Sequence, residues 1–597
     1  MLRQTVEKLG EKAILAGIDP LARDQESHDA VIGFDTEYDS KTRKLVCFQL
    51  AGDKGSGLYT EKLTVDSLAR RAREVISDPD PSAVWLITFW SYAELQFLPV
   101  VKKSLDWKLL GAGSFDCTFE SSDGLELRVF DLARFWSSPP QSLAQVAKSF
   151  NYEKLKFDTK RVSKASLKNP RFKPYALRDA ELCRDIMGQL RAQFIPLGAD
   201  PLISKTAPGV SATVFRKQYI TRKVRCKNPG ARLAGMLACW GGRAEALARG
   251  RFELVYEYDL ESAYPNAAIS IARFPTGAQL EERKTLSGLL DCLGGFGKVI
   301  FSFPDGCRFP CLPVVTTSAQ LYPLSGVSWA TTFELERALE LGADLELLEG
   351  WGYTDGNDSL ARYCRWTLDK RKGTEGAARV AYKLLGNALI GKLAQHKRGI
   401  DIEQMREFCE TEAVDIHDVI NLTVAELETL GIERETRVGT CFAPEWNALI
   451  TGHVRARLNR ILYAGDPVYC ATDSVWTRTP IVKPPSDLGL KRQGPAVVIR
   501  TRLGAILEGE TVHLAMHSLW NRKAALKFVA GFPAVQAIRY HSTRAVKLRE
   551  ALRKRLRLAT FLREVRKGSA VWDGKRELLG SGETVPWRSL DAYLQAN

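Results

Sequence analysis

One stretch near the middle of the chain, Tyr256 to Pro265, most constrains what the chain can fold into. The residues that lead into it alternate between aromatic or apolar side chains and acids, a period of two that is typical of a strand with its acids on one face. A turn ending in Tyr264-Pro265 follows, so Asp259 is predicted at a strand end beside an aromatic ring. A carboxylate there can hold a divalent cation over a bound phosphate, although most strand-end aspartates cap turns. Other parts of the chain decide between these two interpretations.

Size and charge set the broad class. The 597 residues are enough for about three to five domains. The formal net charge of +15 is spread along the chain, which favours a polyanion such as nucleic acid as partner. The first residues lack the apolar core of a secretory leader, and no apolar run approaches the ~18 residues of a membrane span. We therefore expect a cytoplasmic protein without a membrane segment.

The cysteines indicate the same compartment. Twelve are scattered along the sequence, as in reduced intracellular proteins. Cys307 and Cys311 have the spacing of half a zinc site. No second close pair and no nearby histidine completes such a site, so we interpret them as structural thiols.

Four acids and a tyrosine follow one another in a fixed order in the first 195 residues. Asp35 and Glu37 stand two apart at the end of a predicted strand, so they share a face and repel each other unless a cation lies between them. Glu94 opens a short helix after the predicted strand at 84–89. Tyr175 and Asp179 stand four apart on a later helix and share its face. Together these residues form an ordered set: a D-x-E strand, a helix acid, and then Y-x3-D on a helix.

The ordered set resembles the 3′–5′ exonuclease domain of DNA polymerases, of the type that uses Tyr in place of His. The resemblance implies an RNase H-like fold and two metal ions that activate water. The ligands it implies are Asp35, Glu37, Glu94 and Asp179, with Tyr175 orienting the water. Trp90 to Glu94 departs from the Asn-x-x-x-Asp of the family. A lysine that assists in the family corresponds to Lys154 or Lys156.

The region between residues 195 and 255 contains two signals. Five prolines and glycines predict a linker: Pro196, Gly198, Pro201, Pro208 and Gly209. The later Gly241-Gly242 pair, beside Trp240, allows the backbone to approach a nucleic-acid backbone closely. It resembles the Tyr-x-Gly-Gly loop with which family B DNA polymerases grip template DNA. Cys239 stands at the position of the Tyr, and Trp240 supplies the ring.

Two further motifs resemble the metal-binding motifs of family B DNA polymerases. Asp259 to Pro265 resembles Asp-x-x-Ser-Leu-Tyr-Pro, and Tyr469 to Ser474 resembles Tyr-x-Asp-Thr-Asp-Ser. The resemblance implies that Asp259 and Asp473 bind two Mg²⁺ ions, or Mn²⁺ as a substitute, during attack of a primer 3′-hydroxyl on an α-phosphate. It also implies that Tyr264 excludes a 2′-hydroxyl. Ala471 replaces the other aspartate of the family.

A polar stripe with a spacing of four marks a predicted helix from residue 375 to 391. Its members are Glu375, Arg379, Lys383, Asn387 and Gly391. In isolation such a stripe is most often a solvated face. The spacing of Lys383, Asn387 and Gly391 resembles the fingers motif of the same family, which binds the incoming nucleotide. Additional phosphate contacts are assigned to Arg371, Lys372 and Arg379, whereas Ile390 and Ala388 replace the Tyr and Ser of the family.

The C-terminal segment from Ser542 to Lys567 is strongly basic with leucines at intervals, and it predicts a thumb helix on duplex phosphates. The Lys-x-Tyr that the family keeps near the primer end has no clean counterpart. Lys523 and Lys527 are the candidates. The two histidines His513 and His517 are interpreted as structural.

The fold class we predict is α/β (α+β) and multidomain: an RNase H-like exonuclease domain followed by a right-hand polymerase with palm, fingers and thumb. The predicted ranges are 1–195 exonuclease, 196–270 first palm part, 271–362 insertion, 363–395 fingers, 396–440 second insertion, 441–540 second palm part and 541–597 thumb. Size and motif spacing place the resemblance closest to compact family B polymerases of phages, viruses and linear plasmids. That type starts from a priming protein, while some relatives start without a primer. The resemblance implies that one insertion, here 271–362, holds the priming protein and that the other, here 396–440, enables strand displacement.

The predicted function is a monomeric DNA-directed DNA polymerase with a proofreading exonuclease, acting on template-primer DNA and deoxynucleoside triphosphates, with a priming protein as a further partner. Ala471 and Ile390 motivate one alternative, a weakened polymerase retained as a DNA-binding protein. A second alternative is a repair nuclease that works through Asp35 and Glu37.

Overall fold

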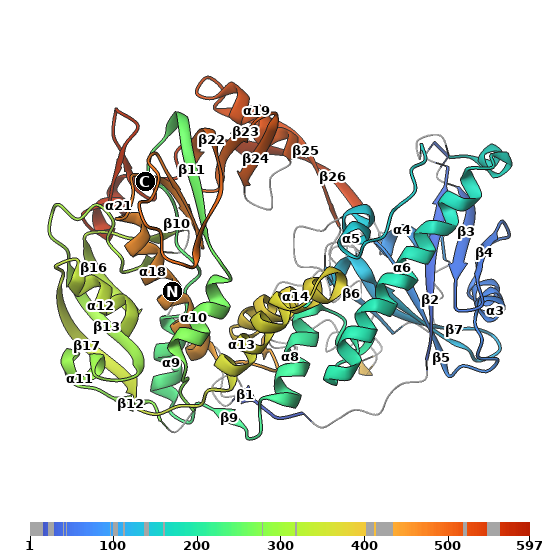
Figure 1. Ribbon diagram of the computed structural model, residues 1–597, viewed down its shortest axis with the longest axis horizontal. Coiled ribbons are helices and arrows are strands. Elements are labelled where there is room, and N and C mark those ends of the chain that lie inside the picture. The colour runs from blue at the N-terminus through green and yellow to red at the C-terminus, as the bar shows by residue number, and fades with distance from the viewer. Residues whose placement is uncertain are drawn as a thin grey trace.

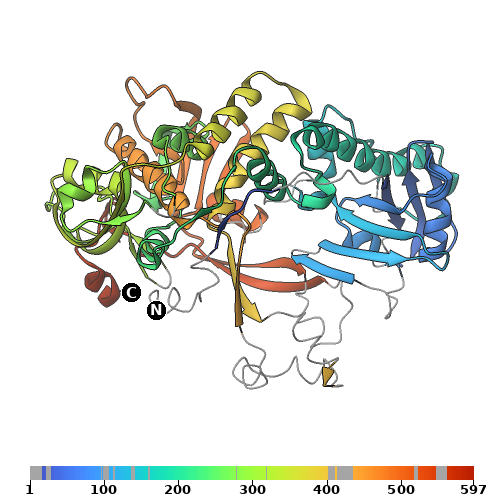
Figure 2. The ribbon, with the colours of Figure 1, turned by 90° about the horizontal axis from the view of Figure 1, so that it is seen from below.

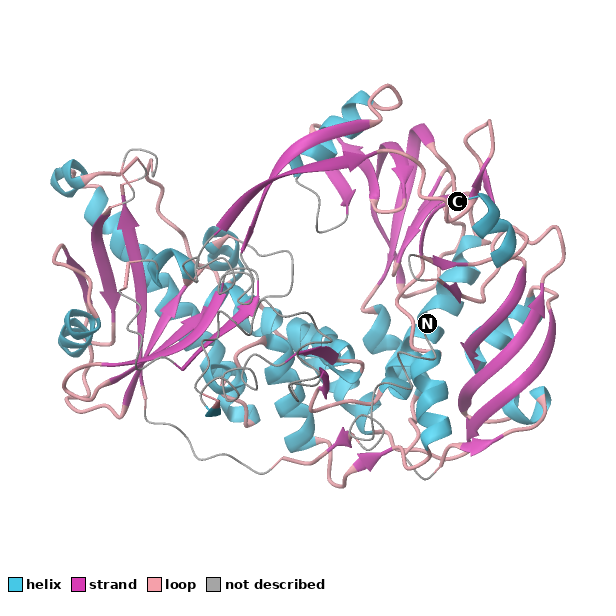
Figure 3. Cartoon of the chain, turned by 180° about the vertical axis from the view of Figure 1, so that it is seen from behind, coloured by secondary structure: helices cyan, strands magenta, loops and turns pink. Residues whose placement is uncertain are grey.

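The chain folds around two sheets of seven strands each, with helices between them (Figures 1 and 3). The computed structural model describes residues 16–21, 29–39, 41–42, 44–95, 97–98, 106–111, 114–135, 142–158, 162–276, 279–316, 319–400, 411–412, 434–516, 522–545 and 561–596. The mixture of helices and sheets confirms the predicted α/β multidomain class. None of the described helices is long and apolar enough to cross a membrane.

The N-terminal sheet has the strand order β4-β3-β2-β5-β8-β7-β6. Its strands are β2 (Ala30–Tyr38), β3 (Leu45–Ala51), β4 (Ser56–Tyr59), β5 (Ala83–Thr88), β6 (Asp106–Gly111), β7 (Ser114–Glu120) and β8 (Glu126–Asp131). Strands β2, β5 and β8 pair in parallel, and the outer pairs are antiparallel. Every residue of β5 is buried, as expected for a central strand covered on both faces.

Helices pack on this sheet and lead out of it. They are α3 (Val65–Val75), α4 (Tyr92–Leu95), α5 (Leu143–Ser149) and α6 (Phe172–Phe194). The long helix α6 packs on β2, β3 and β5. A two-residue strand near the N-terminus, β1 (Gly17–Ile18), pairs instead with β9 (Val224–Arg225) beyond the sheet.

The predicted linker after residue 195 is wrong, because this region is helical. It contains η4 (Ile195–Leu197), α7 (Pro201–Ser204), α8 (Ala207–Gln218) and α9 (Pro229–Leu237). Pro196, Pro201 and Pro208 stand in the first turns of their helices, where the missing N–H costs nothing. Helix α8 packs against α14 (Gly376–Leu393), so the join is part of the core.

The C-terminal sheet is antiparallel and has the order β10-β20-β21-β11-β22-β23-β24. Its strands are β10 (Ala244–Ala246), β11 (Gly250–Leu260), β20 (Pro467–Ala471), β21 (Ser474–Thr477), β22 (Leu488–Arg500), β23 (Leu503–Glu508) and β24 (Thr511–Met516). Helices α10 (Ala263–Ile271) and α18 (Pro444–Leu462) pack against each other beside it. The strict alternation predicted before Asp259 is wrong, because irregularities interrupt β11 after Phe252 and Glu257. Val255 and Tyr258 are therefore buried, while Leu254 is 43% exposed.

A smaller sheet and a helical pair separate the two halves of this C-terminal sheet in the sequence. The small sheet has the order β12-β17-β13-β16, formed by β12 (Glu281–Glu282), β17 (Asp344–Tyr353), β13 (Gly294–Ser302) and β16 (Ser325–Thr331). With it go β14 (Val314–Val315), β15 (Gln320–Leu321), α11 (Leu286–Leu290) and α12 (Thr332–Glu340). The helical pair is α13 (Ser359–Lys372) and α14, which pack against each other.

Two ribbons extend from this body (Figure 2). The first pairs β18 (His396–Ile400) with β19 (Arg434–Val438), and most of the second predicted insertion between them lies outside the described residues. The second pairs β25 (Ala537–Ala545) with β26 (Phe561–Ser569) and runs from α19 (Arg522–Gly531) toward the N-terminal sheet (Figure 1). A thumb helix over 542–567 is thus wrong for its described ends, and residues 546–560 lie outside the described residues. Leucine spacing suggested a helix, but threonine, tyrosine, valine and aromatic residues favour strands at both ends.

The last residues return to the body of the molecule. They form β27 (Glu577–Leu578), β28 (Thr584–Val585) and α21 (Leu590–Ala596). The N–H groups of Leu324 and Ser325 bond to the carbonyls of Trp587 and Arg588, which attaches this segment to the small sheet. The range 541–597, predicted as thumb, therefore includes a segment that packs elsewhere.

Candidate active sites

The two polymerase-motif acids lie on neighbouring strands of the C-terminal sheet. Asp259 is near the end of β11, directly opposite Ser474 on β21. Asp473 precedes Ser474 in the two-residue turn between β20 and β21, where Thr472 has a φ of 65°. The N–H of Leu260 donates to the carbonyl of Asp473 over 2.8 Å. The structure thus brings together the two acids that are more than 200 residues apart in the sequence.

The electrostatics at this point suit a divalent cation. Burial, and then the charge of Asp259, raise the pKa of Asp473. Asp259 Oδ1 is buried without a hydrogen-bond partner, whereas its Oδ2 lies 2.5 Å from Lys491 Nζ. Two adjacent carboxylates, one with an unpartnered oxygen, are a fitting donor set for a hard cation. Within the described parts of the chain, no three His, Cys, Asp or Glu side chains are already arranged as a complete set of metal ligands.

The Gly-Gly loop touches both motifs. Gly242 packs so closely that an added Cβ would lie 3.0 Å from Thr472 Cα and 3.1 Å from the Tyr264 hydroxyl. Tyr264 is half-buried there, and burial, followed by the charge of Asp473, raises its pKa to about 12. The loop is held from behind by Arg455, whose Nη1 donates to the carbonyls of Trp240 (2.6 Å) and Gly241 (3.1 Å). The predicted template loop and the predicted sugar-contacting tyrosine therefore form one surface.

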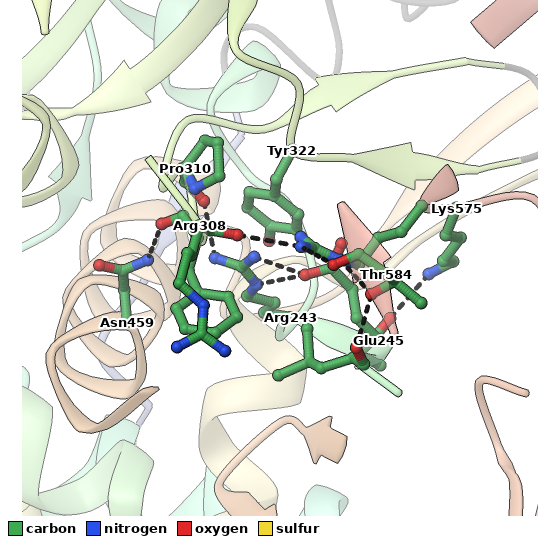
Figure 4. Close-up of polar contacts among 12 residues, drawn as sticks. Arg243, Glu245, Arg308, Pro310, Tyr322, Asn459, Lys575 and Thr584 are labelled. Carbon is green, nitrogen blue, oxygen red and sulfur yellow. Dashed lines mark hydrogen bonds and ion pairs between the residues drawn. The ribbon is translucent and has the colours of Figure 1, made fainter. Parts of the chain in front are cut away.

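Residues after the loop are anchored by a buried polar network (Figure 4). Arg243 donates through Nε to Glu245 Oε2 (2.6 Å) and through Nη1 to the carbonyl of Pro310 (2.7 Å). Lys575 Nζ donates to the carbonyl of Ala244 (3.0 Å). Arg576, which is buried like Arg243, donates to the Arg308 carbonyl and to Thr584 Oγ1. The C-terminal segment and the small sheet thus fix the base of the Gly-Gly loop.

The fingers-motif residues lie on an exposed face, as the four-residue spacing predicts. Helix α14 begins after Glu375, and the other stripe members Arg379, Lys383, Asn387 and Gly391 are all exposed. At the end of α13, Arg371 Nη1 donates to Ser262 Oγ over 3.0 Å, so this helix reaches the Asp259 motif. Arg379 Nη1 lies 3.5 Å from the Arg371 carbonyl. Lys372 is exposed beside Arg371.

Cys239 and Ile390, two residues that depart from the family pattern, belong to one contact network. Asn447 Nδ2 donates to the Ile390 carbonyl (2.7 Å), and Cys239 Sγ lies 3.2 Å from Asn447 Oδ1. The Ile390 side chain is buried and packs in the core. Asn447 thus joins Cys239, just before the Gly-Gly loop, to α14, and no motif in the sequence indicated this contact.

The exonuclease-motif residues also converge. Gly33 on β2 lies against α6 so closely that an added Cβ would be 1.8 Å from the Ala180 carbonyl oxygen, and this approach brings Asp179 beside Asp35. Burial, and then the charges of Asp179 and Glu37, raise the pKa of Asp35. Burial, and then the charge of Asp179, raise the pKa of Glu37 to about 7. A hydrogen bond between the side chains of Tyr175 and Glu37 acts in the opposite direction and lowers this pKa.

The remaining members complete this cluster. Glu94 is buried on α4, and burial followed by the charge of Asp35 raises its pKa. Lys154 Nζ lies 2.5 Å from Asp179 Oδ2, whereas Lys156 is exposed, so Lys154 is the lysine of the site. Glu94 Oε2 and Asp179 Oδ1 are buried without a hydrogen-bond partner. Crowded carboxylates with unpartnered oxygens fit divalent cations.

One acid outside the predicted motifs shapes this site. Asp131, at the end of β8, accepts the N–H groups of Trp90 and Ser91 at 3.0 and 2.9 Å. It thereby fixes the turn that precedes Glu94, in which Trp90 has a φ of 70°. The departure from Asn-x-x-x-Asp is accommodated by this turn.

The Lys-x-Tyr candidates and His513 lie on different elements. Lys523 and Lys527 lie on α19, and His513 lies on β24 with its Nε2 3.2 Å from Glu508 Oε2. His517 lies outside the described residues. Cys307 and Cys311 are buried free thiols, beside the Tyr463 hydroxyl and the Glu334 carbonyl respectively.

The two halves of the chain have the fold of an exonuclease domain followed by a right-hand polymerase. No protein-family model matches the chain. Primer-independent DNA polymerase PolB of Escherichia coli is 28% identical to it over 262 residues, which cover 41% of this chain and 28% of that relative. The match thus spans less than a third of the relative's length.

Solved structures cover more of the chain. Phi29 DNA polymerase in complex with primer-template DNA and incoming nucleotide matches 91% of this chain and 100% of its own, with a TM-score of 0.63 and 14% identity. The same polymerase with primer-template DNA alone gives a TM-score of 0.62 and 13% identity. The chain has the fold of phi29 DNA polymerase, and its resemblance to compact family B DNA polymerases is confirmed.

Proposed function

We propose that the chain is a DNA-directed DNA polymerase that transfers nucleotides from deoxynucleoside triphosphates to a 3′-hydroxyl on a DNA template. The observation that carries this proposal is the position of Asp259 on β11 beside the turn that carries Asp473, joined by the Leu260 N–H bond to the Asp473 carbonyl and in contact with the Gly-Gly loop through Thr472 and Tyr264. The relative named as a DNA polymerase and the polymerase fold support it.

The chain's own residues have distinct tasks in this reaction. Asp259 and Asp473 would hold two Mg²⁺ ions, for which Mn²⁺ substitutes. When bound, these ions lower the pKa of the attacking hydroxyl and offset charge on the leaving pyrophosphate. The backbone of the turn at Leu260–Ala263 borders the triphosphate, and Tyr264 lies under the sugar, where it excludes a 2′-hydroxyl. The basic and amide side chains bind phosphates and position the nucleotide: Arg371, Lys372, Arg379, Lys383 and Asn387.

Template binding falls to the Gly-Gly loop. Gly241 and Gly242 bring the backbone close to the template strand, with Trp240 beside them. We retain the other predicted domain ranges as a proposal, with residues 363–395 as fingers, and limit the thumb to the β25–β26 ribbon. The β25–β26 ribbon, which carries Arg539, Arg544, Arg563 and Arg566, takes the place of the predicted thumb helix on duplex phosphates.

We further propose that the N-terminal domain is a 3′–5′ exonuclease. Asp35, Glu37, Glu94 and Asp179 would hold the cations, and Tyr175 would orient the water. Support comes from the mutual elevation of carboxyl pKa values and from the unpartnered oxygens of Glu94 and Asp179.

Primer extension with Mg²⁺ tests the polymerase proposal. We expect wild type to extend a labelled primer and Asp259→Ala to bind the same DNA without extending it. If both bind and neither extends, the chain is a DNA-binding protein, the alternative that Ala471 motivated. Degradation of single-stranded DNA tests the second site: Asp35→Ala should abolish it and leave extension unchanged. Undiminished degradation by Asp35→Ala would refute the exonuclease assignment.

The start of synthesis is a separate question. The name of the Escherichia coli relative favours synthesis without a primer over a priming protein. We therefore propose that the chain starts DNA strands on circular single-stranded template without primer or second protein. New strands that begin with a 5′-triphosphate would support this. Labelled nucleotide joined covalently to an added protein would support protein priming and overturn it.

A further inference from the structure

A lysine on a neighbouring strand faces the acids of the palm site. Lys491 Nζ lies 2.5 Å from Asp259 Oδ2 and 3.3 Å from Glu257 Oε1. Asp259 and Glu257 are two apart on β11, and Lys491 is on β22, which pairs with β11. None of the motifs considered above includes Lys491 or Glu257. The palm site therefore has a cationic side whose function remains to be assigned.

A β-bulge puts the lysine there. Glu257 pairs with Arg492 and Tyr258 with Leu490, so Lys491 is the extra residue of β22 at the irregularity. In a regular ladder Lys491 and Arg492 would point to opposite faces. The bulge turns both toward the acids, and Arg492 Nε lies 3.0 Å from Glu257 Oε2. The bulge therefore sets on which face of the sheet the Lys491 side chain lies.

The two acids differ in how firmly they are held. Glu257 is buried, and its Oε2 accepts a hydrogen bond from Arg492. Its Oε1, the oxygen nearer Lys491, accepts a hydrogen bond from the Ser474 hydroxyl over 3.3 Å. Asp259 has no hydrogen-bond donor on Oδ1, and Lys491 is the donor on Oδ2 within the described residues. An incoming cation at Asp259 would therefore meet the lysine ammonium there, whereas Glu257 offers the ammonium a fixed second position.

We propose that Lys491 is a positioning residue that competes with a divalent cation for Asp259. In the metal-free protein its ammonium neutralises Asp259, and when a cation binds it withdraws toward Glu257. Two positive charges a few ångströms apart repel each other, so the lysine weakens cation binding until a nucleotide brings compensating negative charge. This inference rests on the proposed polymerase function of the same site. According to this proposal, Lys491 keeps the affinity of Asp259 for a divalent cation low until a nucleotide binds.

Mn²⁺ binding without DNA or nucleotide tests the proposal, with free Mn²⁺ measured by electron paramagnetic resonance. The background carries Asp35→Ala and Asp179→Ala, so that cations of the N-terminal site are not counted. We expect Lys491→Met to bind Mn²⁺ about two- to fivefold more tightly, within the range for one partly exposed ion pair. Lys491→Arg keeps the charge and should bind no more tightly than the parent. Circular dichroism confirms that each variant is folded.

Lys284→Met is the matched control. It removes the same charge from an exposed position near the small sheet and should change Mn²⁺ affinity less than about twofold, because water and salt screen a distant surface charge. Unchanged or weaker binding by Lys491→Met would overturn the proposal, as would equally tight binding by Lys491→Arg. Asp259→Ala in the same background tests the underlying function: retained Mn²⁺ binding would refute the cation site itself, whatever Lys491 does.

Discussion

Leu260 donates its backbone N–H to the carbonyl oxygen of Asp473, which joins the strand carrying Asp259 to the turn carrying Asp473 through main-chain atoms alone. Replacing either carboxylate therefore leaves the frame in place. We expect Asp473→Asn to reduce single-turnover nucleotide incorporation by a factor of about 10³ or more. The free energy of unfolding should change by less than about 1 kcal/mol. Asp344→Asn, at an exposed strand end of the small sheet, should leave both unchanged. Full incorporation by Asp473→Asn would remove this residue from the site.

The crowding of acids in the N-terminal site predicts a trade between stability and function. Burial, and then Asp179 and Glu37, raise the pKa of Asp35, so its charge is unfavourable in the folded protein without metal. In EDTA we expect Asp35→Asn to be more stable than wild type by roughly 1 kcal/mol or more. Millimolar Mg²⁺ should stabilise wild type and narrow this difference, because only wild type binds the ion fully. Thermal melting in EDTA and in Mg²⁺ measures the two stability differences. If Asp35→Asn is less stable than wild type in EDTA, the charge of Asp35 is not unfavourable in the folded protein.

The sequence indicated which candidate side chains share a face because their spacing is local. Asp35 and Glu37 share a strand face, Tyr175 and Asp179 share a helix face, and both pairs keep this relationship in the fold. The exposed stripe on α14 likewise follows from the helical period alone.

What the sequence could not indicate depends on long-range registration or on the backbone. Lys491 reaches Asp259 only because of a bulge between β11 and β22, and hydropathy patterns do not reveal bulges. Arg455 reaches the Trp240 carbonyl from a helix 215 residues later in the chain. Two predictions were wrong because their local pattern fits two structures. Prolines occur in linkers and also in the first turns of helices, and a basic segment with leucines can form a helix or a β-ribbon.

A buried histidine predicts a pH dependence of stability. Burial, and then the charges of Arg457 and Arg460, lower the pKa of His453 to about 4, partly countered by Asp487. The unfolded chain has the usual value near 6.5, so it binds the proton first as the pH falls. The free energy of unfolding is therefore unaffected by His453 above about pH 6.5 and decreases progressively as the pH falls from 6.5 to 4. The loss at pH 5 relative to pH 7.5 is about 2 kcal/mol.

Urea unfolding of wild type and His453→Phe at several pH values measures this contribution. The ring of His453 packs edge-on against Phe333 at 5.1 Å between centroids, so phenylalanine preserves an aromatic contact without a titrating group. We expect the difference between the two proteins to shift by about 2 kcal/mol in favour of the variant between pH 7.5 and pH 5. Parallel pH profiles would show that His453 is not held neutral.

Arg455 and Glu334 form the buried ion pair that supports the template loop, with side chains 1% and 0% exposed. Removing one partner leaves a buried charge without compensation, which costs about 3–5 kcal/mol. We therefore expect Arg455→Met to destabilise the fold by that amount and to weaken template binding, because Trp240 and Gly241 lose the donor to their carbonyls. Chemical denaturation and a gel-shift titration measure the two effects.

Two companion variants separate the buried charge from the loss of the arginine side chain. Glu334→Gln keeps an acceptor for the Thr331 N–H that starts α12. The double variant Arg455→Met/Glu334→Gln should therefore recover part of the stability but none of the template affinity. Arg460→Met, on the same helix, breaks an exposed pair with Glu340 and should cost less than about 1 kcal/mol. If Arg455→Met costs no more than Arg460→Met, or if the double variant binds template like wild type, Arg455 does not hold the loop through this pair.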